Sequence, residues 1–370
     1  MSYIEIIIHA VFWLLGFLII WRIPVCMKSP EDPDISSVVE NISVIIPARN
    51  EQENLPRLLN SLSGQTKKPL EIIVVDDDST DSTAEIAKDH GARIIRLKDL
   101  PPGWVGKTWA CHNGASKAKG KYYLFLDADT YLEDDGIEKI ASCAKSRKGV
   151  VSIQPYHKIK KLYENLSLFF NIILIAGMGA FTVLGKAVRP IGAFGPCMLC
   201  SARDYDRIGG HESIKGKVME DIAIGKEFLK KGINLHCMGG KEVIDFRMYP
   251  GGFMDVVVGW SKGFSTGARS TSIIVLIMVI AWIVGAIFPI NLLVTGLGSM
   301  DIALLILSAV FYTAFVIQIY CMSWRIGRFN FFASMLYFIP LAFFIIIFLY
   351  SFILTFIRRK VSWKDRHIKT

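Results

Sequence analysis

Residues 71–81 read EIIVVDDDSTD and residues 122–129 read YYLFLDAD, and the two stretches share one order of residue types. Each begins with a short apolar run rich in β-branched or aromatic side chains and ends in closely spaced aspartates. Such runs are typical of strands that are buried on both faces of a parallel sheet. Because ligands bind beyond the carboxyl ends of strands in these sheets, the aspartates are expected at a ligand-binding edge.

Strand and helix signals alternate around these two stretches, which predicts an α/β fold with helices covering both faces of a parallel sheet. The expected strands are residues 42–47, 71–76, 92–97 and 122–126. The expected helices are residues 55–63, 79–88 and 109–118.

Long apolar segments flank this charge-rich part of a chain that is 52% hydrophobic. Residues 4–21 can cross a hydrocarbon core about 30 Å thick, and they end at Trp21-Arg22 instead of the small residues of a signal-peptide cleavage site. They are therefore expected to be a retained anchor. Further spans are expected at 272–297, 301–322 and 331–357. The predicted organisation is an anchor (1–24), a linker (25–38), a catalytic domain (39–270), about three transmembrane helices (271–358) and a basic tail (359–370).

The net charge of +9 is concentrated beside the apolar segments and is not interleaved with aromatic residues in the charge-rich part. This distribution favours a membrane surface over nucleic acid. Arg22 and Lys28 follow the first apolar segment, which predicts a cytoplasmic catalytic domain in a multi-pass protein of the cell membrane. Three more spans would place the basic tail outside. Either Pro340 divides 331–357 into a re-entrant hairpin or one expected span does not cross.

Residues 166–184 are also apolar, but Gly177 and Gly179 interrupt them. A crossing here would separate Asp127 from Glu220 by the bilayer. We therefore expect an interfacial helix, or a helix packed on the catalytic domain.

Three acidic clusters carry the expected chemistry. Residues 76–81 (DDDSTD) would either accept hydrogen bonds from a ribose or cap the helix that follows. Asp127-Ala128-Asp129 would suit Mg²⁺ or Mn²⁺ that also grips a diphosphate. Glu220-Asp221 is either an ordinary solvated acidic pair or the source of a general base.

Cys197 and Cys200 form a single CxxC pair among seven scattered cysteines. A zinc site needs about four ligands, and no second pair follows at a suitable spacing. Buried, reduced thiols are the expected state.

The three acidic clusters, in this order, resemble the family 2 inverting glycosyltransferases with the GT-A fold, a Rossmann-like nucleotide-sugar-binding domain. The family's opening is similar to residues 44–51 (VIIPARNE), and the stretch 208–212 (IGGHE) precedes Glu220-Asp221 as in the family. The resemblance covers about residues 41–265. It implies that a nucleotide is held by Pro47, Ala48, Arg49, Glu51 and Asp77.

The same resemblance assigns the remaining site residues. Asp127 and Asp129 would bind the metal, and Asp127 would also handle the diphosphate. Asp221 would be the catalytic base with Glu220 as its support. Lys107 matches a lysine that approaches the donor phosphates, although a surface loop lysine is the alternative.

One motif departs from the pattern of membrane members, which often carry Gln/Arg-x-x-Arg-Trp. The corresponding stretch, 256–263, reads VVVGWSKG. Trp260 is retained and is expected on the donor side, but the Gln and Arg are absent, which argues against processive polymer synthesis. Lys262 could replace the missing arginine as a point charge on phosphate.

Residues 101–110 (PPGWVGKTWA), with one anchor, a catalytic domain and trailing spans, resemble the glycosyltransferases of carotenoid pathways that act on 4,4'-diaponeurosporenoate. Hopanoid-associated glycosyltransferases are similar too. These resemblances imply transfer of a sugar, glucose from UDP-glucose, to a lipid such as a carotenoid carboxylic acid. A polyprenyl phosphate, a hopanoid or a glycerolipid is the alternative acceptor. A catalytically silent nucleotide-sugar-binding scaffold is the non-enzyme alternative.

Overall fold

The computed structural model describes residues 3–28, 34–185, 188–217, 219–261, 271–353, 361–363 and 366–368. The chain forms two compact units. The α/β unit comprises Pro24–His157 and Gly192–Arg247, and the helical unit comprises Met1–Ile23, Lys158–Ile191 and Met248–Thr370.

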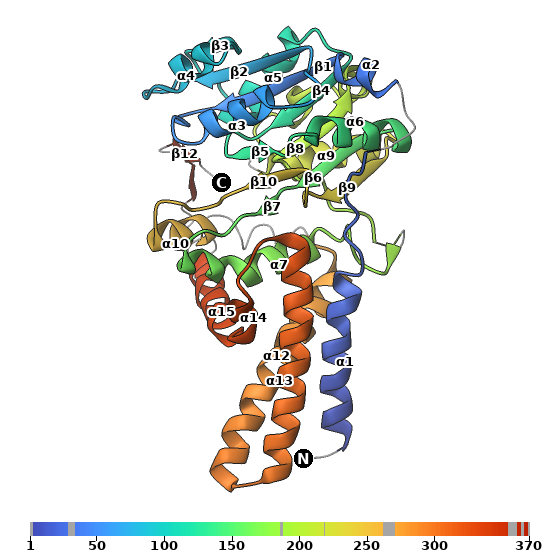
Figure 1. Cartoon of the computed structure of the whole chain (residues 1–370), viewed down its shortest axis with the longest axis vertical. Helices are drawn as coiled ribbons and strands as arrows, with labels where there is room; N and C mark the ends of the chain where they lie inside the picture. Colours follow the sequence, from blue (N-terminus) through green and yellow to red (C-terminus); the bar gives the residue numbers. More distant parts are fainter. Residues whose placement is uncertain are drawn as a thin grey trace. The chain divides into compact units, whose positions relative to one another are not determined.

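The α/β unit is built on a seven-stranded sheet with the order β3-β2-β1-β4-β8-β6-β9 (Figure 1). Its strands are β1 (Ile42–Ala48), β2 (Glu71–Asp77), β3 (Arg93–Leu97), β4 (Tyr122–Leu126), β6 (Val150–Gln154), β8 (Cys197–Ser201) and β9 (Leu235–Gly239). A smaller sheet has the order β5-β10-β7 and consists of β5 (Thr130–Leu132), β7 (Tyr156–His157) and β10 (Ile244–Phe246).

Helices cover both faces of the large sheet because its central strands are apolar on both sides. Val44 and Ile46 belong to one buried core together with Leu58 of α3. Ile45, between them, faces α5, where a Cβ on Gly114 would collide with the Ile45 side chain. Glycine at that point lets the helix backbone lie close to the strand. The helices of this unit are α2 (Ile35–Val39), α3 (Leu55–Ser63), α4 (Thr83–Asp89), α5 (Gly106–Lys117), α6 (Gly136–Arg147), α8 (Ala202–Arg207), the 3-10 helix η3 (Gly210–Ile214) and α9 (Glu220–Lys230).

The strands expected at 42–47, 71–76 and 122–126 are confirmed to within one residue. The prediction of a parallel sheet was wrong in one respect, since β8 runs antiparallel to both β4 and β6. The helix expected at 79–88 begins only at Thr83, because the side chains of Asp76 and Asp81 accept backbone N–H groups and hold the preceding residues in a turn. The helix expected at 109–118 begins earlier, at Gly106.

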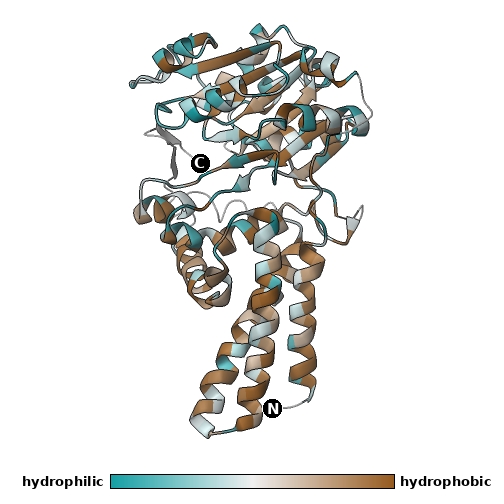
Figure 2. Cartoon of the chain, in the orientation of Figure 1, coloured by the Kyte–Doolittle hydropathy of each residue, from teal (hydrophilic) through white to brown (hydrophobic). Residues whose placement is uncertain are grey.

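In the helical unit, α1 (Tyr3–Ile19), α12 (Ile273–Ser299) and α13 (Ile302–Ile326) pack side by side (Figure 1). Most residues of these three helices are apolar (Figure 2). Buried Gln318 joins all three helices: it accepts a hydrogen bond from Trp282 Nε1 (2.8 Å) and donates one to the carbonyl of Trp13 (2.8 Å). Within the described residues, α12 and α13 are the two helices long and apolar enough to cross a membrane.

The other apolar segments form short helices. Residues 166–184 contain the end of η1 (Leu162–Ser167) and α7 (Leu168–Gly177), which stops at the first of the expected glycines. Residues 331–357 contain α14 (Phe331–Met335) and α15 (Phe338–Phe352), with Pro340 in the first turn of α15. The 15 residues of α15 span only about 22 Å, less than the roughly 30 Å of a hydrocarbon core. This unit also contains α10 (Phe253–Ser261), β11 (Val361–Trp363) and β12 (Arg366–Ile368).

Candidate active site

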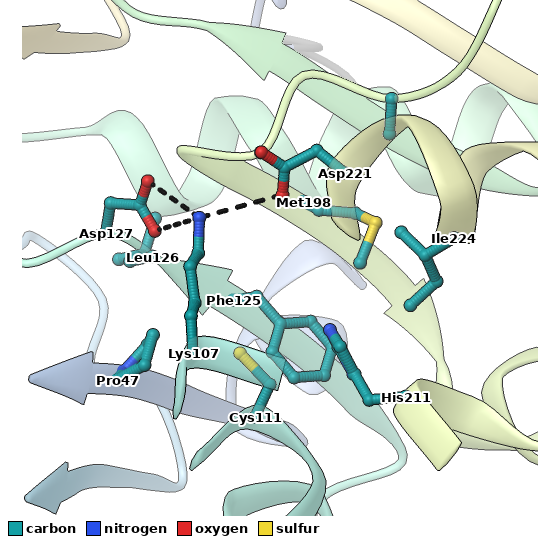
Figure 3. A pocket seen from close by; sticks show the side chains of 12 residues that line it. Pro47, Lys107, Cys111, Phe125, Leu126, Asp127, Met198, His211, Asp221 and Ile224 are labelled. Atoms are coloured by element: carbon teal, nitrogen blue, oxygen red, sulfur yellow. Dashed lines mark hydrogen bonds and ion pairs between the residues drawn. The ribbon is translucent and has the colours of Figure 1, made fainter. Parts of the chain in front are cut away.

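The ammonium group of Lys107 lies among three carboxylates, two of which, Asp127 and Asp221, are drawn in Figure 3. Its Nζ is 2.8 Å from Asp127 Oδ1, 3.1 Å from Glu220 Oε1 and 3.6 Å from Asp221 Oδ1. Lys107 belongs to the first turn of α5, Asp127 follows β4, and the acidic pair opens α9. The structure therefore brings together the metal motif, the acidic pair and the lysine that the sequence analysis singled out separately. The alternative of a free surface lysine was wrong, since the Lys107 side chain is only 19% exposed.

Burial and neighbouring charges both shift the pKa values of the groups in this cluster. Desolvation would lower the pKa of Lys107, but the charges of Asp127, Asp221 and Glu220 outweigh it and hold that pKa well above its usual value. Desolvation raises the pKa of the Asp221 carboxyl, and the neighbouring Glu220 raises it further. Desolvation also raises the pKa of Asp129 to about 7, with the charges of Asp127 and Glu51 adding to the shift. One ammonium group thus balances an excess of carboxylates.

The residues after β4 fit a metal ion that is shared with a substrate. Among the described residues, no group of three or more His, Cys, Asp or Glu side chains is placed to hold a metal by itself. A magnesium or manganese ion bound together with a diphosphate needs only one or two protein carboxylates. Asp127 and Asp129 supply that number, and Asp127 already faces a cation in the form of Lys107.

The loops after β1 and β2 are tied together. Arg49 Nη1 donates to the carbonyl of Asp77 (2.5 Å), and the Asn50 side chain accepts from the backbone N–H of Thr80 (2.9 Å). The backbone N–H of Glu51 donates to Thr83 Oγ1 (2.8 Å). Residues expected to hold a nucleotide, Pro47 to Glu51 and Asp77, therefore form one connected edge at the carboxyl ends of two adjacent parallel strands.

The segment Gly192–Pro196 lies directly against the first turns of α9. The backbone N–H of Ala193 donates to the carbonyl of Asp221 (3.2 Å). A Cβ on Gly195 would fall on the Asp221 carboxyl group, and a Cβ on Gly192 would collide with the backbone of Ile222. Small residues at these positions are what allows the segment to approach the helix so closely. The segment therefore fixes where the Asp221 side chain lies.

Ser152, which is buried in β6, holds this segment in place. Its hydroxyl donates to the carbonyl of Phe194 (3.0 Å) and accepts from the N–H of the same residue (2.6 Å). Ser152 has no exposed surface. Both of these hydrogen bonds are made to the Gly192–Pro196 segment, which in turn contacts Asp221.

Apolar side chains form the floor of the pocket below Lys107 (Figure 3). His211 also lines it, and burial, with the nearby charge of Lys107, lowers the pKa of its imidazole to about 3. The His211 ring Nδ1 lies 2.9 Å from the Tyr205 hydroxyl. A neutral histidine of this kind supports the pocket wall and does not add a second cation. The remaining wall residues include Pro47, Cys111, Phe125, Met198 and Ile224.

Two residues singled out in the sequence lie elsewhere. Trp260 belongs to the helical unit, where its indole donates to Ser167 Oγ (2.9 Å) and stacks on Phe170. A contact between Trp260 and the donor stays a prediction. Cys197 and Cys200 are buried, unbridged thiols on β8, as expected.

Sequence reasoning missed Ser152 and the Gly192–Pro196 segment. A signal was present in the spacing of glycines in 192–196 (GAFGP), because two glycines so close together often mark a tight backbone approach. Ser152 carries no comparable signal, since a serine within a strand has no particular pattern.

Comparison with known proteins shows the class to which this α/β fold belongs. Residues 43–197 match the model of glycosyl transferase family 2. Two glycosyltransferases match a larger share of the chain than this family model does. The chain therefore belongs to glycosyl transferase family 2 and has the GT-A fold.

These relatives are both named 4,4'-diaponeurosporenoate glycosyltransferase. The protein of Staphylococcus haemolyticus is 40% identical over 253 residues, which are 67% of each chain. The protein of Staphylococcus aureus (strain USA300) is 33% identical over 329 residues, 88% of this chain and 87% of the relative. Among solved structures, a mannosyltransferase from Pyrobaculum calidifontis in complex with GDP-Man and Mn²⁺ is 15% identical and superposes with a TM-score of 0.53, over 94% of this chain and 95% of that one. At this identity the likeness concerns the fold.

Proposed function

We propose that this glycosyltransferase moves glucose from UDP-glucose to a carotenoid carboxylic acid, with inversion at the sugar. The observation that carries the proposal is the convergence of Asp127, Glu220 and Asp221 on Lys107. The acceptor follows from the names of relatives that cover most of the chain.

The donor would lie along the carboxyl edge of β1, β2 and β4. Pro47, Ala48, Arg49, Glu51 and Asp77 would hold the uridine. Lys107 would leave part of its carboxylate shell and approach the diphosphate, for which its high pKa keeps it protonated. Asp127 and Asp129 would hold a divalent cation, and a bound cation of this kind neutralises charge on the diphosphate.

Transfer would be a single displacement. An oxygen of the acceptor carboxylate attacks the anomeric carbon, the bond from that carbon to the diphosphate oxygen breaks, and its electron pair leaves with UDP. The product is a sugar ester of inverted configuration. Because a carboxylic acid is ionised near neutral pH, no proton has to be removed, and Asp221 would orient the attacking group. With a hydroxyl acceptor, Asp221 would also take up the proton.

The test uses the full chain purified in detergent, with labelled UDP-glucose and a carotenoid acid. A base-labile glucosyl ester, identified by mass spectrometry, is expected, with the inverted anomer seen by NMR. Excess chelator should abolish its formation, and Mg²⁺ or Mn²⁺ should restore it. Glucose transfer to a polyprenyl phosphate but not to the carotenoid acid would replace the proposed acceptor. Full activity in excess chelator would remove the metal from the proposal.

The protein is further proposed to cross the membrane three times, through α1, α12 and α13, with the catalytic domain on the cytoplasmic side. The packing of α1 against the two span-length helices supports this number. An odd number of crossings leaves the basic tail on the same side as the residues that follow α1. Both basic clusters would then obey the positive-inside rule.

A further inference from the structure

Three aromatic side chains gather on the first half of α5 and on the loop that precedes it. The ring of Trp104 lies 4.9 Å from that of Trp109 and 5.1 Å from that of His112, between ring centroids. Trp109 and His112 stack with an interplanar angle of 16°. All three rings are half-buried, so part of this aromatic cluster faces solvent.

A lysine from a different loop lies over this cluster. Lys215 Nζ is 5.5 Å from the centre of the Trp104 ring, within the range of a cation–π contact. The Lys215 stem fills the space above Gly103, where a Cβ would lie 3.2 Å from Lys215 Cε. Among the described residues, Lys215 forms no salt bridge with a carboxylate, and it is exposed.

Both loops lead directly into the active site. Trp104 precedes Lys107 by three residues, and Lys215 precedes Glu220 by five. The 3-10 helix η3, which ends next to Lys215, packs against both α5 and α9. The aromatic cluster and Lys215 therefore belong to the two chain segments that run into Lys107 and Glu220, and η3 connects these segments.

The charge of the site sets a requirement for an acidic acceptor. Three carboxylates face one ammonium group around Lys107. They would repel the carboxylate of an acidic acceptor unless another cation paired with it. A polyene acid also carries a flat conjugated chain next to its carboxylate, and aromatic faces pack well against flat π-systems.

Building on the proposed function, we propose that Lys215 and the Trp104–Trp109–His112 cluster form the acceptor site of this enzyme. Lys215 pairs with the acceptor carboxylate, and Trp104 packs against the first conjugated bonds. The site selects lipids that end in a carboxylate joined to a planar unsaturated chain. It does not touch the donor.

The test compares two acceptors, the carotenoid acid and the corresponding carotenoid alcohol, in the full chain in detergent. Lys215→Gln should raise KM for the acid about tenfold and leave KM for the alcohol nearly unchanged, while Lys215→Arg should keep the wild-type KM. Trp104→Leu should raise KM for both acceptors. The matched control is Lys217→Gln, which removes an exposed lysine from the same loop and should behave as wild type.

A second readout separates binding from folding and from the proposed function. KM for UDP-glucose and the slow hydrolysis of UDP-glucose without acceptor should be unchanged in every variant. If the wild-type chain does not glucosylate the acid, the proposed function fails. If it does, but Lys215→Gln and Trp104→Leu keep the wild-type KM for the acid, or Lys217→Gln raises it equally, the acceptor site is wrong and the function stands.

Discussion

The ammonium group of Lys107 contacts carboxylates from two segments that are 93 positions apart at their nearest, Asp127 and Glu220. Each acidic cluster was recognisable in the sequence from its position after a strand or from its order along the chain. The sequence did not show that the clusters lie close together around Lys107, because this depends on how α5 and α9 approach β4. The antiparallel β8 and the segment before it bring α9 to that edge.

Asp221 is predicted to be the catalytic residue, with Glu220 as its support. Asp221→Asn keeps the shape and removes the charge, and positioned acid–base groups typically contribute about 10²–10⁴-fold. With a hydroxyl acceptor, kcat should fall by roughly that factor while the Kd for UDP-glucose barely changes. Asp129→Asn should instead weaken donor binding and turnover together. A near wild-type kcat for Asp221→Asn, or a loss of donor affinity like that of Asp129→Asn, would show that the base assignment is wrong.

Gly195 is predicted to control the position of the Asp221 carboxyl group. In Gly195→Ala the new methyl group would occupy the space of that carboxyl, so the side chain must move away from Lys107. We expect kcat to fall at least tenfold, since small displacements of positioned groups reduce rates strongly, with KM for UDP-glucose retained. Gly64→Ala is the control, because its Cβ would make only ordinary contacts with the backbone of α3. Equal kcat values for the two variants would contradict the prediction.

At the scale of elements, the limits of the strands were easier to predict than the direction of β8 or the start of α5. β1, β2 and β4 are apolar runs bounded by acidic or turn residues, so their limits follow from composition. The direction of β8 does not follow from composition, because a strand that is buried on both faces has the same apolar character whether it runs parallel or antiparallel to its neighbours. The start of α5 at Gly106 was missed since glycine and proline in 101–106 indicate a loop.

Ser152 is predicted to support catalysis through the Gly192–Pro196 segment. Ser152→Ala removes both hydrogen bonds to Phe194 and should destabilise the protein by about 1–3 kcal/mol. It should also lower kcat severalfold with little effect on KM for UDP-glucose.

Ser43 offers a matched control for this variant. It is equally buried, lies on β1, and makes two hydrogen bonds, to Glu71 (2.7 Å) and from the N–H of Gly120 (2.8 Å). Ser43→Ala should lose similar stability in thermal unfolding, yet keep kcat at temperatures where both variants are folded. If both variants lose kcat in proportion to their stability, Ser152 has a structural role only.

At the scale of the whole molecule, hydropathy identified the apolar segments but not the lengths of the helices that they form. Residues 331–357 were as apolar as the segments before them, yet a break after Met335 leaves a helix of only 15 residues. In the proposed topology 331–357 does not cross, and the conflict between the number of spans and the basic tail disappears. Since α1 and α15 are both shorter than α12 and α13, the proposed topology depends on which helices pack together.

The proposed topology predicts where single cysteines react with a membrane-impermeant thiol reagent in intact cells. The background is Cys321→Ser, because Cys321 is the exposed cysteine within the described residues. Ser299→Cys, at the end of α12, should be labelled without permeabilisation. Ser37→Cys, in α2 of the α/β unit, and Ser362→Cys, in the tail, should be labelled only after the membrane is opened. The reason is that α1 and the α12–α13 pair return the chain to the cytoplasmic side. Labelling of Ser362→Cys in intact cells would mean that 331–357 crosses after all, and labelling of Ser37→Cys would place the catalytic domain outside.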